Sequence, residues 1–364
     1  MTNDNIYMRR ALSLAKRGAG WVNPNPVVGA VLVKDGRILG EGFHEFFGGP
    51  HAEANALQGV SDESAAGSVL YVTLEPCVHE GKTSPCVNLI LEKKITKVVV
   101  GMADPNPLIN GQGISFLQSK GIQVEVGLMA SRAREMNEVF IKYITTKHPF
   151  VLLKSAMTLD GKIATVTNAS RWITGETSRK MVHLLRQRLS AVMVGVNTVM
   201  FDDPLLNIRL KGVCKNPLKV IADTHGRIST EAKVLTNDPQ LTLIATTDLA
   251  DPVKLKQIER MGAQVMICPL KNNMVDLGFV MNSLGVMGID SIMIEGGSTL
   301  AFSALQEGIV DKVISFIAPK ILGGANAPTA VGGIGIEKME DAITLTKMRT
   351  RKVGQDLMIE AWLK

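Results

Sequence analysis

The segment SVLYVTLEPCVHEGKTSPC, residues 68–86, decides the fold of the first half of this chain. Its apolar beginning predicts a buried strand that leads into Cys77, and Cys86 opens a predicted helix over residues 86–94. Eight residues separate the two cysteines. A strand followed by a polar loop and a helix is the repeating unit of an α/β fold, and the paired cysteines indicate a metal site at its centre.

A second short stretch, HAEANAL (51–57), supplies the other groups that such a site needs. Zinc that serves catalysis has three protein ligands and one open position, and the candidates are His51, Cys77 and Cys86. Glu53 shares a helical turn with His51, so we expect it over the open position as the catalytic acid and base. Bound zinc lowers the pKa of water from 15.7 to about 7. His79 is a competing but less favoured ligand.

Strands and helices alternate along the whole sequence, which predicts an α/β protein. VVGAVLV and RILGEG flank the turn KDG and predict a hairpin. A long helix is expected over residues 130–145, and another over residues 273–284. The polar, proline-containing stretch TTKHP (145–149) predicts a linker. We therefore expect two domains, residues 1–146 and 147–364.

Composition limits the ligands and the location of the protein. The net charge of +6 favours anionic ligands, whereas aromatic residues are only 4% of the 364 residues, so small phosphates are favoured over nucleic acid. No apolar run approaches the roughly 18 residues of a membrane span. The N-terminus has no secretory pattern and the four cysteines do not suggest a disulfide framework, so we expect a cytoplasmic protein without a membrane partner.

Three motifs carry a resemblance in the first half: NPNPVVG (23–29), GFHEFFGGPHAE (42–53) and the long cysteine loop. They resemble the deaminase half of the bifunctional riboflavin-biosynthesis deaminase–reductases. The general zinc-deaminase pattern H-x-E…P-C-x-x-C has only two residues between its cysteines. Ser84 stands where the family usually has proline. The resemblance implies that four residues contact the deaminase substrate: Asn25, His44, Lys82 and Thr83.

The second half contains SIMIEGGSTLAFSAL (291–305), a strand that runs into two glycines and then a helix. Backbone N–H groups at such a helix start suit a pyrophosphate. A Rossmann site has no support, because no G-x-G-x-x-G follows the first strand of either half. Three further motifs precede this stretch: KSAMTLDGKIA (154–164), NASRWITG (168–175) and GVNTVMFDDPLLNIR (195–209). These motifs and their order along the chain resemble the reductase half of the same family.

That resemblance implies a cytidine-deaminase-like three-layer domain followed by a dihydrofolate-reductase-like domain. It implies an NADPH site lined by Ala156, Trp172, Thr198, Asp202, Thr224 and the run from Gly297 onward. It also implies a ribose-phosphate site formed by Ser170, Arg186, Leu206, Arg209 and Glu295. Guanidinium groups suit a phosphate monoester because they make bidentate, charge-assisted contacts. Lys154, Asp202 and Glu295 are the candidates that protonate or stabilise an oxygen during reduction.

The implied function is zinc-dependent deamination of a diaminopyrimidine ribosyl phosphate, followed by NADPH reduction of its ribosyl group to ribityl. We also expect a homo-oligomer and no nucleic-acid partner. The alternative is an RNA-editing zinc deaminase with a C-terminal recognition module. Arg227, just beyond the strand KVIAD, suits the 2′-phosphate of NADPH, although the neighbouring Asp223 is the residue type that binds the ribose of NAD.

Overall fold

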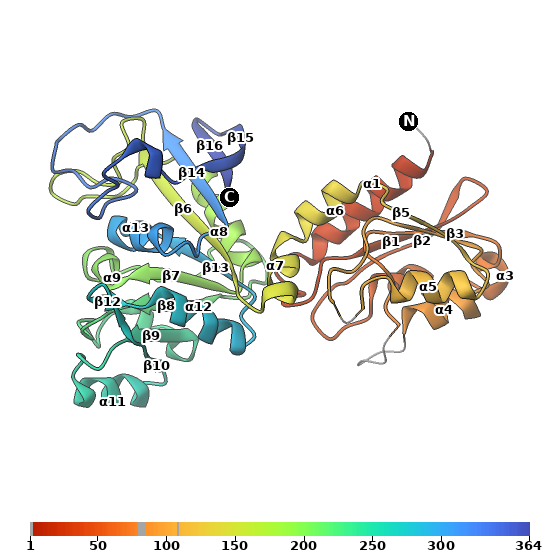
Figure 1. Cartoon of the computed structure of the whole chain (residues 1–364), viewed down its shortest axis with the longest axis horizontal. Coiled ribbons are helices and arrows are strands. Elements are labelled where there is room, and N and C mark those ends of the chain that lie inside the picture. Colours follow the sequence, from red (N-terminus) through yellow and green to blue (C-terminus); the bar gives the residue numbers. More distant parts are fainter. Residues whose placement is uncertain (1–2, 79–84, 108) are drawn as a thin grey trace. The chain divides into compact units, whose positions relative to one another are not determined.

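Two compact units make up the chain, Met1–Lys147 and His148–Lys364. The computed structural model describes residues 3–78, 85–107 and 109–364, and Figure 1 labels the elements of both units. Each unit has its own sheet and its own hydrophobic core. Among the described residues, no helix has the length and apolar character that a membrane span requires.

A five-stranded sheet forms the centre of the first unit, in the order β2-β1-β3-β4-β5. β1 is antiparallel to β2 and β3, whereas β3, β4 and β5 are parallel. Helices α1 and α6 cover one face and α4 and α5 the other (Figure 1), which gives the predicted three layers. The strands are β1 (Gly29–Lys34), β2 (Arg37–Phe43), β3 (Val69–Val72), β4 (Lys97–Val100) and β5 (Gln123–Val126).

The helices of this unit bury apolar side chains against a sheet whose inner strand β1 is buried from Gly29 to Val33. A continuous apolar strand is expected where both faces of a sheet are covered. The helices are α1 (Asn3–Ala15), η1 (Lys16–Gly18), α2 (Ala52–Leu57), α3 (Asp62–Ala65), α4 (Cys86–Glu92), α5 (Gln112–Ser119), α6 (Ala130–Met136) and α7 (Glu138–Thr146).

Two glycines of β2 determine how closely α2 approaches the sheet. A Cβ atom on Gly40 would lie 2.0 Å from the Ala56 carbonyl oxygen, and one on Gly42 would lie 2.3 Å from the Ala56 nitrogen. Only glycine allows this backbone contact. The contact places the start of α2, with His51 and Glu53, directly against the edge of the sheet.

A nine-stranded sheet forms the centre of the second unit, in the order β10-β9-β8-β7-β13-β6-β14-β16-β15. The strands from β10 to β14 in this order are parallel, and β16 and β15 continue the sheet antiparallel. The strands are β6 (Phe150–Thr158), β7 (Ala191–Gly195), β8 (Leu218–Ala222), β9 (Thr242–Thr246), β10 (Gln264–Ile267), β13 (Ser291–Glu295), β14 (Lys312–Ala318), β15 (Leu345–Val353) and β16 (Asp356–Leu363).

Two further short strands, β11 (Leu270–Lys271) and β12 (Met274–Val275), pair with each other. Parallel strands need crossover connections, and helices supply most of them here. The helices are α8 (Glu176–Arg188), α9 (Val196–Asp202), α10 (Lys233–Thr236), η2 (Pro239–Leu241), α11 (Pro252–Arg260), α12 (Leu277–Val286), α13 (Ser298–Gln306) and η3 (Met339–Asp341).

The structure differs from the predicted elements in three places. The helix expected over 130–145 is broken at Asn137 (φ −105°, ψ 21°), whose side-chain amide pairs with the backbone of Val27. The helix expected over 273–284 begins only at Leu277, because β12 precedes it and Asp276 caps it by accepting a hydrogen bond from the Phe279 N–H. The hairpin β15–β16 was not predicted at all.

Candidate functional sites

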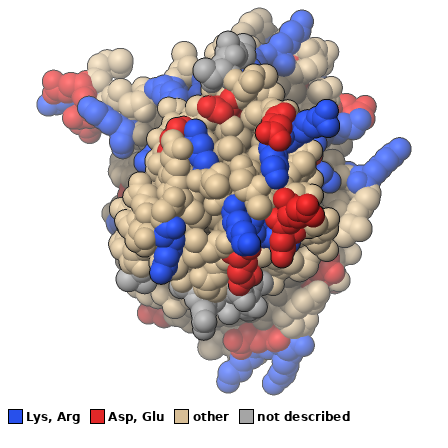
Figure 2. All heavy atoms as spheres, turned by 90° about the vertical axis from the view of Figure 1, so that its right-hand side faces the viewer, with Lys and Arg blue, Asp and Glu red and all other residues tan. Residues whose placement is uncertain are grey.

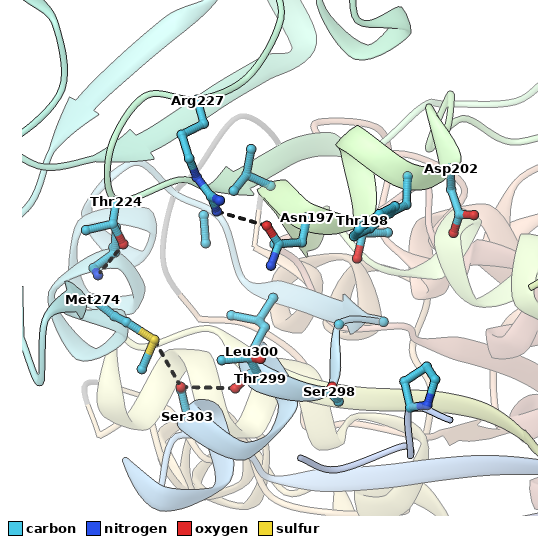
Figure 3. Close-up of a pocket in the computed structure, with 18 of the residues that line it drawn as sticks. Asn197, Thr198, Asp202, Thr224, Arg227, Met274, Ser298, Thr299, Leu300 and Ser303 are labelled. Carbon is cyan, nitrogen blue, oxygen red and sulfur yellow. Dashed lines mark hydrogen bonds between the residues drawn. The ribbon is translucent and has the colours of Figure 1, made fainter. Parts of the chain in front are cut away.

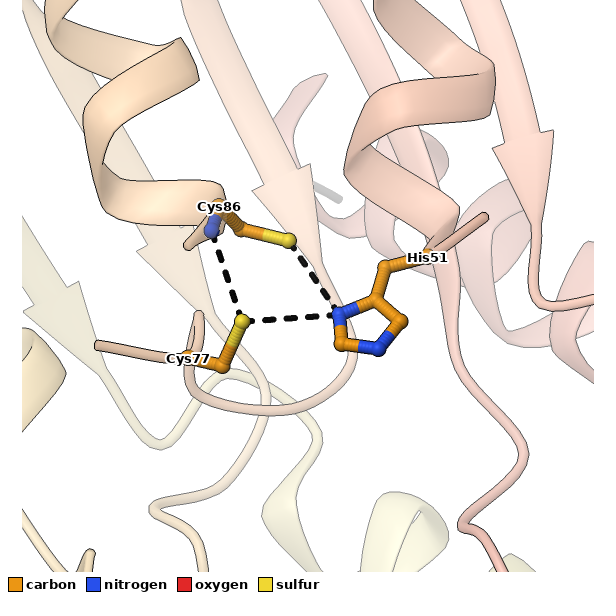
Figure 4. Close-up of side chains that lie close together, drawn as sticks. All are labelled: His51, Cys77 and Cys86. Atoms are coloured by element: carbon orange, nitrogen blue, oxygen red, sulfur yellow. Dashed lines mark hydrogen bonds between the residues drawn. The ribbon is translucent and has the colours of Figure 1, made fainter. Parts of the chain in front are cut away.

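The three predicted zinc ligands meet at one point of the first unit. His51 is the N-cap of α2, Cys86 is the first residue of α4, and Cys77 lies in the loop after β3. The Nδ1 atom of His51 lies 3.4 Å from Cys77 Sγ and 3.3 Å from Cys86 Sγ, and all three atoms lie within 4.8 Å of one another (Figure 4). The edges of a tetrahedral zinc site with nitrogen and sulfur ligands are roughly 3.5 Å long. The cluster therefore fits a zinc ion.

The surroundings of the cluster favour a thiolate at Cys77. The Cys86 thiol donates a hydrogen bond to it and His51 interacts with it, and together they lower the pKa of Cys77 to about 4. The backbone N–H of Cys86, at the start of α4, also donates to Cys77 Sγ at 3.4 Å. Thiolate is the form that binds a metal. The same interaction with Cys77 raises the pKa of His51.

Glu53 is buried beside this cluster, with 3% of its surface exposed. Burial, and next the negative charge of Cys77, raise its pKa to about 7. The carboxyl group interacts with the Cys86 thiol, so it lies at the ligand set although it belongs to the first turn of α2. A carboxyl group whose pKa lies near neutral pH can both accept and donate a proton.

His44 and Asn25 form a hydrogen-bonded pair next to the cluster. The Nδ1 atom of His44 lies 2.9 Å from the Pro50 carbonyl oxygen, to which it donates, so Nε2 accepts from the Asn25 amide at 3.2 Å. The His44 ring is buried, which lowers its pKa, and its centroid is 5.5 Å from that of His51. These two predicted substrate contacts therefore lie beside the metal ligands. The other two, Lys82 and Thr83, lie outside the described residues.

Two buried residues of this unit were missed by the sequence analysis. The carboxylate of Glu75 accepts hydrogen bonds from the backbone N–H groups of Asp104, Gly111, Gly113 and Ile114, at 2.8–3.2 Å. The Asn137 amide holds both backbone polar groups of Val27, two residues from Asn25. The position of Glu75, directly before Pro76 and Cys77, could have indicated its structural role. No residue near Asn137 in the sequence indicated that its amide would pair with Val27.

The second unit contains a cavity of about 540 Å³ between the ends of β7, β8 and β13 and the start of α13. Five predicted residues line it: Ser170, Thr198, Asp202, Thr224 and Gly297. Gly297 has φ +84°, and a Cβ atom there would lie 3.4 Å from Thr198 Oγ1. The backbone at the start of α13 is therefore open to a ligand, as predicted for a pyrophosphate. Figure 3 shows Thr224 and Asp202 at opposite sides of the cavity.

Two residues predicted for the cofactor are not among the described residues that line this cavity, namely Ala156 and Trp172. Ala156 lies on β6, paired with Phe316. The Trp172 ring is 59% exposed, and the guanidinium carbon of Arg179 lies 4.6 Å from its centroid. An exposed ring held by a cation can still contact a ligand that extends beyond the cavity.

The residues predicted for the ribose phosphate form a charged cluster. Arg186 makes a bidentate ion pair with Glu295, at 2.6 and 2.9 Å, and Lys154 Nζ lies 3.8 Å from the same carboxylate. Burial would raise the pKa of Glu295, but the charges of Arg186 and Lys154 and the hydrogen bonds of Arg186 keep it below the usual value. Burial lowers the pKa of Lys154. The single carboxylate therefore balances only one of two buried cations.

A positive field extends from this cluster to the surface. Burial, followed by the charges of Arg186 and Arg209, lowers the pKa of His183 to about 4. The backbone N–H of Arg209 donates to His183 Nδ1 at 3.4 Å, and Leu206 is buried nearby in the chain with φ +52°. Ser170 donates to Asp202 at 2.9 Å. An uncompensated cation and a neighbouring exposed arginine suit a phosphate ester.

Two family models match different parts of the chain. Residues 1–102 match the family model described as "Cytidine and deoxycytidylate deaminase zinc-binding region", and residues 149–359 match "RibD C-terminal domain". The chain is 44% identical over 354 residues to the riboflavin biosynthesis protein RibD of Actinobacillus pleuropneumoniae, covering 97% of this chain and 94% of that protein. It is 44% identical to the RibD of Aquifex aeolicus over 356 residues, covering 98% and 97%.

Solved structures of similar proteins have the same fold. RibD of Acinetobacter baumannii superposes with a TM-score of 0.89 at 35% identity, covering 100% of this chain and 99% of that one. A protein of Thermotoga maritima superposes with a TM-score of 0.84 at 36% identity, with the same coverage. That protein is described as a diaminohydroxyphosphoribosylaminopyrimidine deaminase/5-amino-6-(5-phosphoribosylamino)uracil reductase.

Proposed function

The chain belongs to the RibD family of riboflavin biosynthesis proteins, and from this membership we propose how its residues divide the two reactions of the family. The protein is a bifunctional enzyme, a zinc-dependent deaminase and an NADPH-dependent reductase. It deaminates 2,5-diamino-6-(5-phosphoribosylamino)pyrimidin-4(3H)-one and then reduces the ribosyl group to ribityl. In our proposal, residues 1–146 perform the deamination and residues 147–364 the reduction.

The observation that carries the deaminase assignment is the convergence of His51, Cys77 and Cys86 beside the buried Glu53. Zinc held by these ligands supplies the Lewis acidity that makes water nucleophilic near neutral pH. Glu53 takes a proton from the attacking water and delivers it to the departing amino nitrogen, so that ammonia leaves and a ring carbonyl forms. Asn25 and His44 hold the pyrimidine edge in place, and Lys82 and Thr83 are proposed to complete the substrate site.

In the reductase, NADPH supplies a hydride to C1 of the ring-opened ribose. We assign its binding to Thr198, Asp202, Thr224 and Gly297 in the cavity, with Ala156 and Trp172 as further contacts. The substrate site consists of Lys154, Ser170, Arg186, Leu206, Arg209 and Glu295. The ion pairs of Glu295 keep its pKa below the usual value, which makes it a poor proton donor.

One experiment tests the deaminase half of this proposal. Purified protein should contain about one zinc per chain, and Cys77→Ser should lower the zinc content and abolish deamination. Reduction of pre-deaminated substrate by NADPH should continue in the same variant. Full deaminase activity in a preparation free of metal would contradict the zinc assignment.

The RNA-editing alternative has no support among the relatives or the family models. Figure 2 shows one face of the molecule, on which Lys and Arg side chains alternate with Asp and Glu. Binding of single-stranded nucleic acid usually requires a continuous basic groove with stacking aromatic side chains. The absence of a nucleic-acid partner stays a proposal, and strong, salt-dependent retention on immobilised RNA would contradict it.

A homo-oligomer and a cytoplasmic location belong to the same proposal. β15 is an edge strand of the nine-stranded sheet, and every residue from Leu345 to Lys352 is exposed, including Met348 at 67%. A second copy that covers this edge would remove an exposed strand with apolar side chains. Light scattering at micromolar concentration tests the proposed homo-oligomer, since a monomer would contradict it.

The proposed cytoplasmic location fits the candidate zinc site. A reducing compartment such as the cytoplasm keeps Cys77 and Cys86 available for zinc.

A further inference from the structure

Asp356 is a buried carboxylate at the start of β16, directly after the turn 354–355 of the C-terminal hairpin, with 1% of its surface exposed. Its Oδ2 atom accepts hydrogen bonds from the Gly175 N–H at 2.8 Å and from the Ser178 hydroxyl at 2.6 Å. Gly175 is the N-cap of α8. The hairpin is therefore tied to the start of a helix that lies about half the chain away in the sequence.

The hairpin and the helix are also closely packed at this point. Gly354 has φ +62°, and a Cβ atom there would lie 3.0 Å from Thr177 Oγ1 in the first turn of α8. Gly175 has no side chain that could cap the helix, so the Asp356 carboxylate supplies an acceptor and a negative charge there from a distant part of the chain.

Stability alone is a weak explanation for this contact. The second oxygen of Asp356, Oδ1, is buried and has no hydrogen-bond partner within the described residues. A buried polar atom without a partner costs free energy, which reduces what the contact adds to the stability of the fold. A local serine or asparagine would cap the helix without this cost.

The loop that precedes α8 is supported by the start of this helix. Its residues 166–172 are exposed apart from Ser170, and the chain becomes buried at Thr174. The Thr174 carbonyl oxygen accepts a hydrogen bond from Arg179 Nη1 at 2.7 Å, and the same guanidinium lies against the Trp172 ring. The start of α8 therefore holds the end of the loop that carries two of the predicted site residues.

Helix α8 itself carries another predicted site residue. Arg186 lies about three turns beyond the helix start and makes the bidentate ion pair with Glu295. It also donates a hydrogen bond to the Asn207 carbonyl oxygen at 2.8 Å. Because a helix moves as a rigid element, a shift at its start changes the position of Arg186 as well as that of the loop.

We propose that Asp356 is a positioning residue of the reductase, which places Ser170 and Arg186 for the ribose phosphate by hydrogen bonding to the start of α8. This inference rests on the substrate site proposed above. Asp356 acts through the helix and does not touch the substrate. A displacement of binding groups by about 1 Å can cost about 10²-fold in activity, so the loss of this contact should weaken substrate binding.

Steady-state kinetics of reduction with NADPH and pre-deaminated substrate tests the inference, at a temperature at which circular dichroism shows each variant to be folded. Asp356→Ala should raise KM for the phosphorylated substrate by about 10- to 100-fold, with a much smaller change in kcat. Asp356→Asn keeps an acceptor oxygen for both donors and should recover most of the loss. Deamination should remain at the wild-type rate in both variants.

Asp251→Ala is the matched control. Asp251 caps α11 by accepting a hydrogen bond from the Val253 N–H at 2.9 Å, and no residue of α11 is among the described residues that line the cavity. This variant should have a lower melting temperature but the wild-type KM, so it separates the loss of a helix cap from the loss of position. Hydrogen exchange at residues 170–180 should be faster in Asp356→Ala and slow again in Asp356→Asn.

Ser178→Ala keeps the test decisive if Asp356→Ala does not fold. This variant removes one of the two donors and leaves the carboxylate in place, so it should raise the same KM by about 2- to 10-fold. A wild-type KM in Ser178→Ala would then overturn the inference.

Two results with folded Asp356 variants would also overturn the inference: a wild-type KM in Asp356→Ala, or a KM in Asp356→Asn as high as in Asp356→Ala. Arg209→Ala tests the substrate site itself. A raised KM in Arg209→Ala together with wild-type KM in the Asp356 variants would overturn the positioning role alone. A wild-type KM in Arg209→Ala would overturn the proposed substrate site and this inference with it.

Discussion

Glu53 lies in the first turn of α2, and its neighbours change what its carboxyl group can do. Burial raises its pKa to about 7, whereas a solvated glutamate would be ionised at neutral pH. His51 precedes it by two residues and carries the nitrogen of the candidate metal site. In the proposed mechanism, the start of one helix therefore supplies both a metal ligand and a proton carrier.

Glu53→Ala removes the proton carrier but no metal ligand, so zinc and the fold should survive. Deamination should fall by about 10²- to 10⁴-fold, the usual contribution of a positioned acid and base. Reduction of pre-deaminated substrate should remain near the wild-type rate. Assays of the variant with both substrates check this, and comparable losses in the two activities would mean a single shared site.

Glu295 and Arg209 should respond differently to removal. Glu295→Ala leaves Arg186 and Lys154 buried without their carboxylate, so the free energy of unfolding should fall by about 3–5 kcal/mol. Denaturant titration measures this loss.

Arg209→Ala removes a cation that does not pair with Glu295, so it should mainly raise KM for the phosphorylated reductase substrate. Steady-state kinetics with the phosphorylated and the dephosphorylated substrate measures this effect. If a dephosphorylated substrate loses as much as the phosphorylated one in Arg209→Ala, Arg209 is structural.

At the scale of elements, the N-terminus of α5 is hydrogen-bonded to the loop that carries Cys77. The Glu75 carboxylate accepts N–H groups from the first turn of α5, which satisfies donors that a helix leaves unpaired. A Cβ atom on Gly113 would lie 2.1 Å from the Pro76 carbonyl oxygen. The start of α5 is therefore packed against the backbone immediately before Cys77.

Gly113→Ala should push this loop away from α5, lower the free energy of unfolding by about 2–3 kcal/mol and reduce the zinc content. Gly111→Ala is the control, since it lies at the same helix start with no atom within 4 Å of the added Cβ, although its φ of +80° costs about 1 kcal/mol. Calorimetry and metal analysis measure both variants. Zinc loss that is equal in the two would show that packing against Pro76 does not support the site.

At the scale of the whole molecule, the two units have separate sheets and separate cores, and each holds one set of proposed site residues. Zinc removal by a chelator should therefore lower the melting temperature of one calorimetric transition only. NADPH at 100 times its Kd should stabilise the other by about 2.7 kcal/mol. If both ligands shift one common transition, the units unfold together and the proposed independence is wrong.

The sequence by itself determined the local features of this protein. The alternation of apolar strands and amphipathic helices, the hairpin at KDG and the motifs around His51, Cys77 and Cys86 are short-range patterns, because neighbouring residues set strand and helix periodicity. These patterns, together with the family resemblance, were sufficient to predict the α/β class and the three-layer first domain, and they named the three side chains that the structure brings together as a candidate metal site.

Only the tertiary structure decided the features that join distant residues. Arg186 pairs with Glu295 across 109 residues and Asn137 holds Val27 across 110, and nothing near either residue in the chain encodes its partner. The burial of Asp223 also depends on the surrounding fold, so the sequence could not tell whether this acid faces a ribose or an arginine. Partners and burial arise when elements pack together, and packing depends on the whole chain rather than on any local pattern.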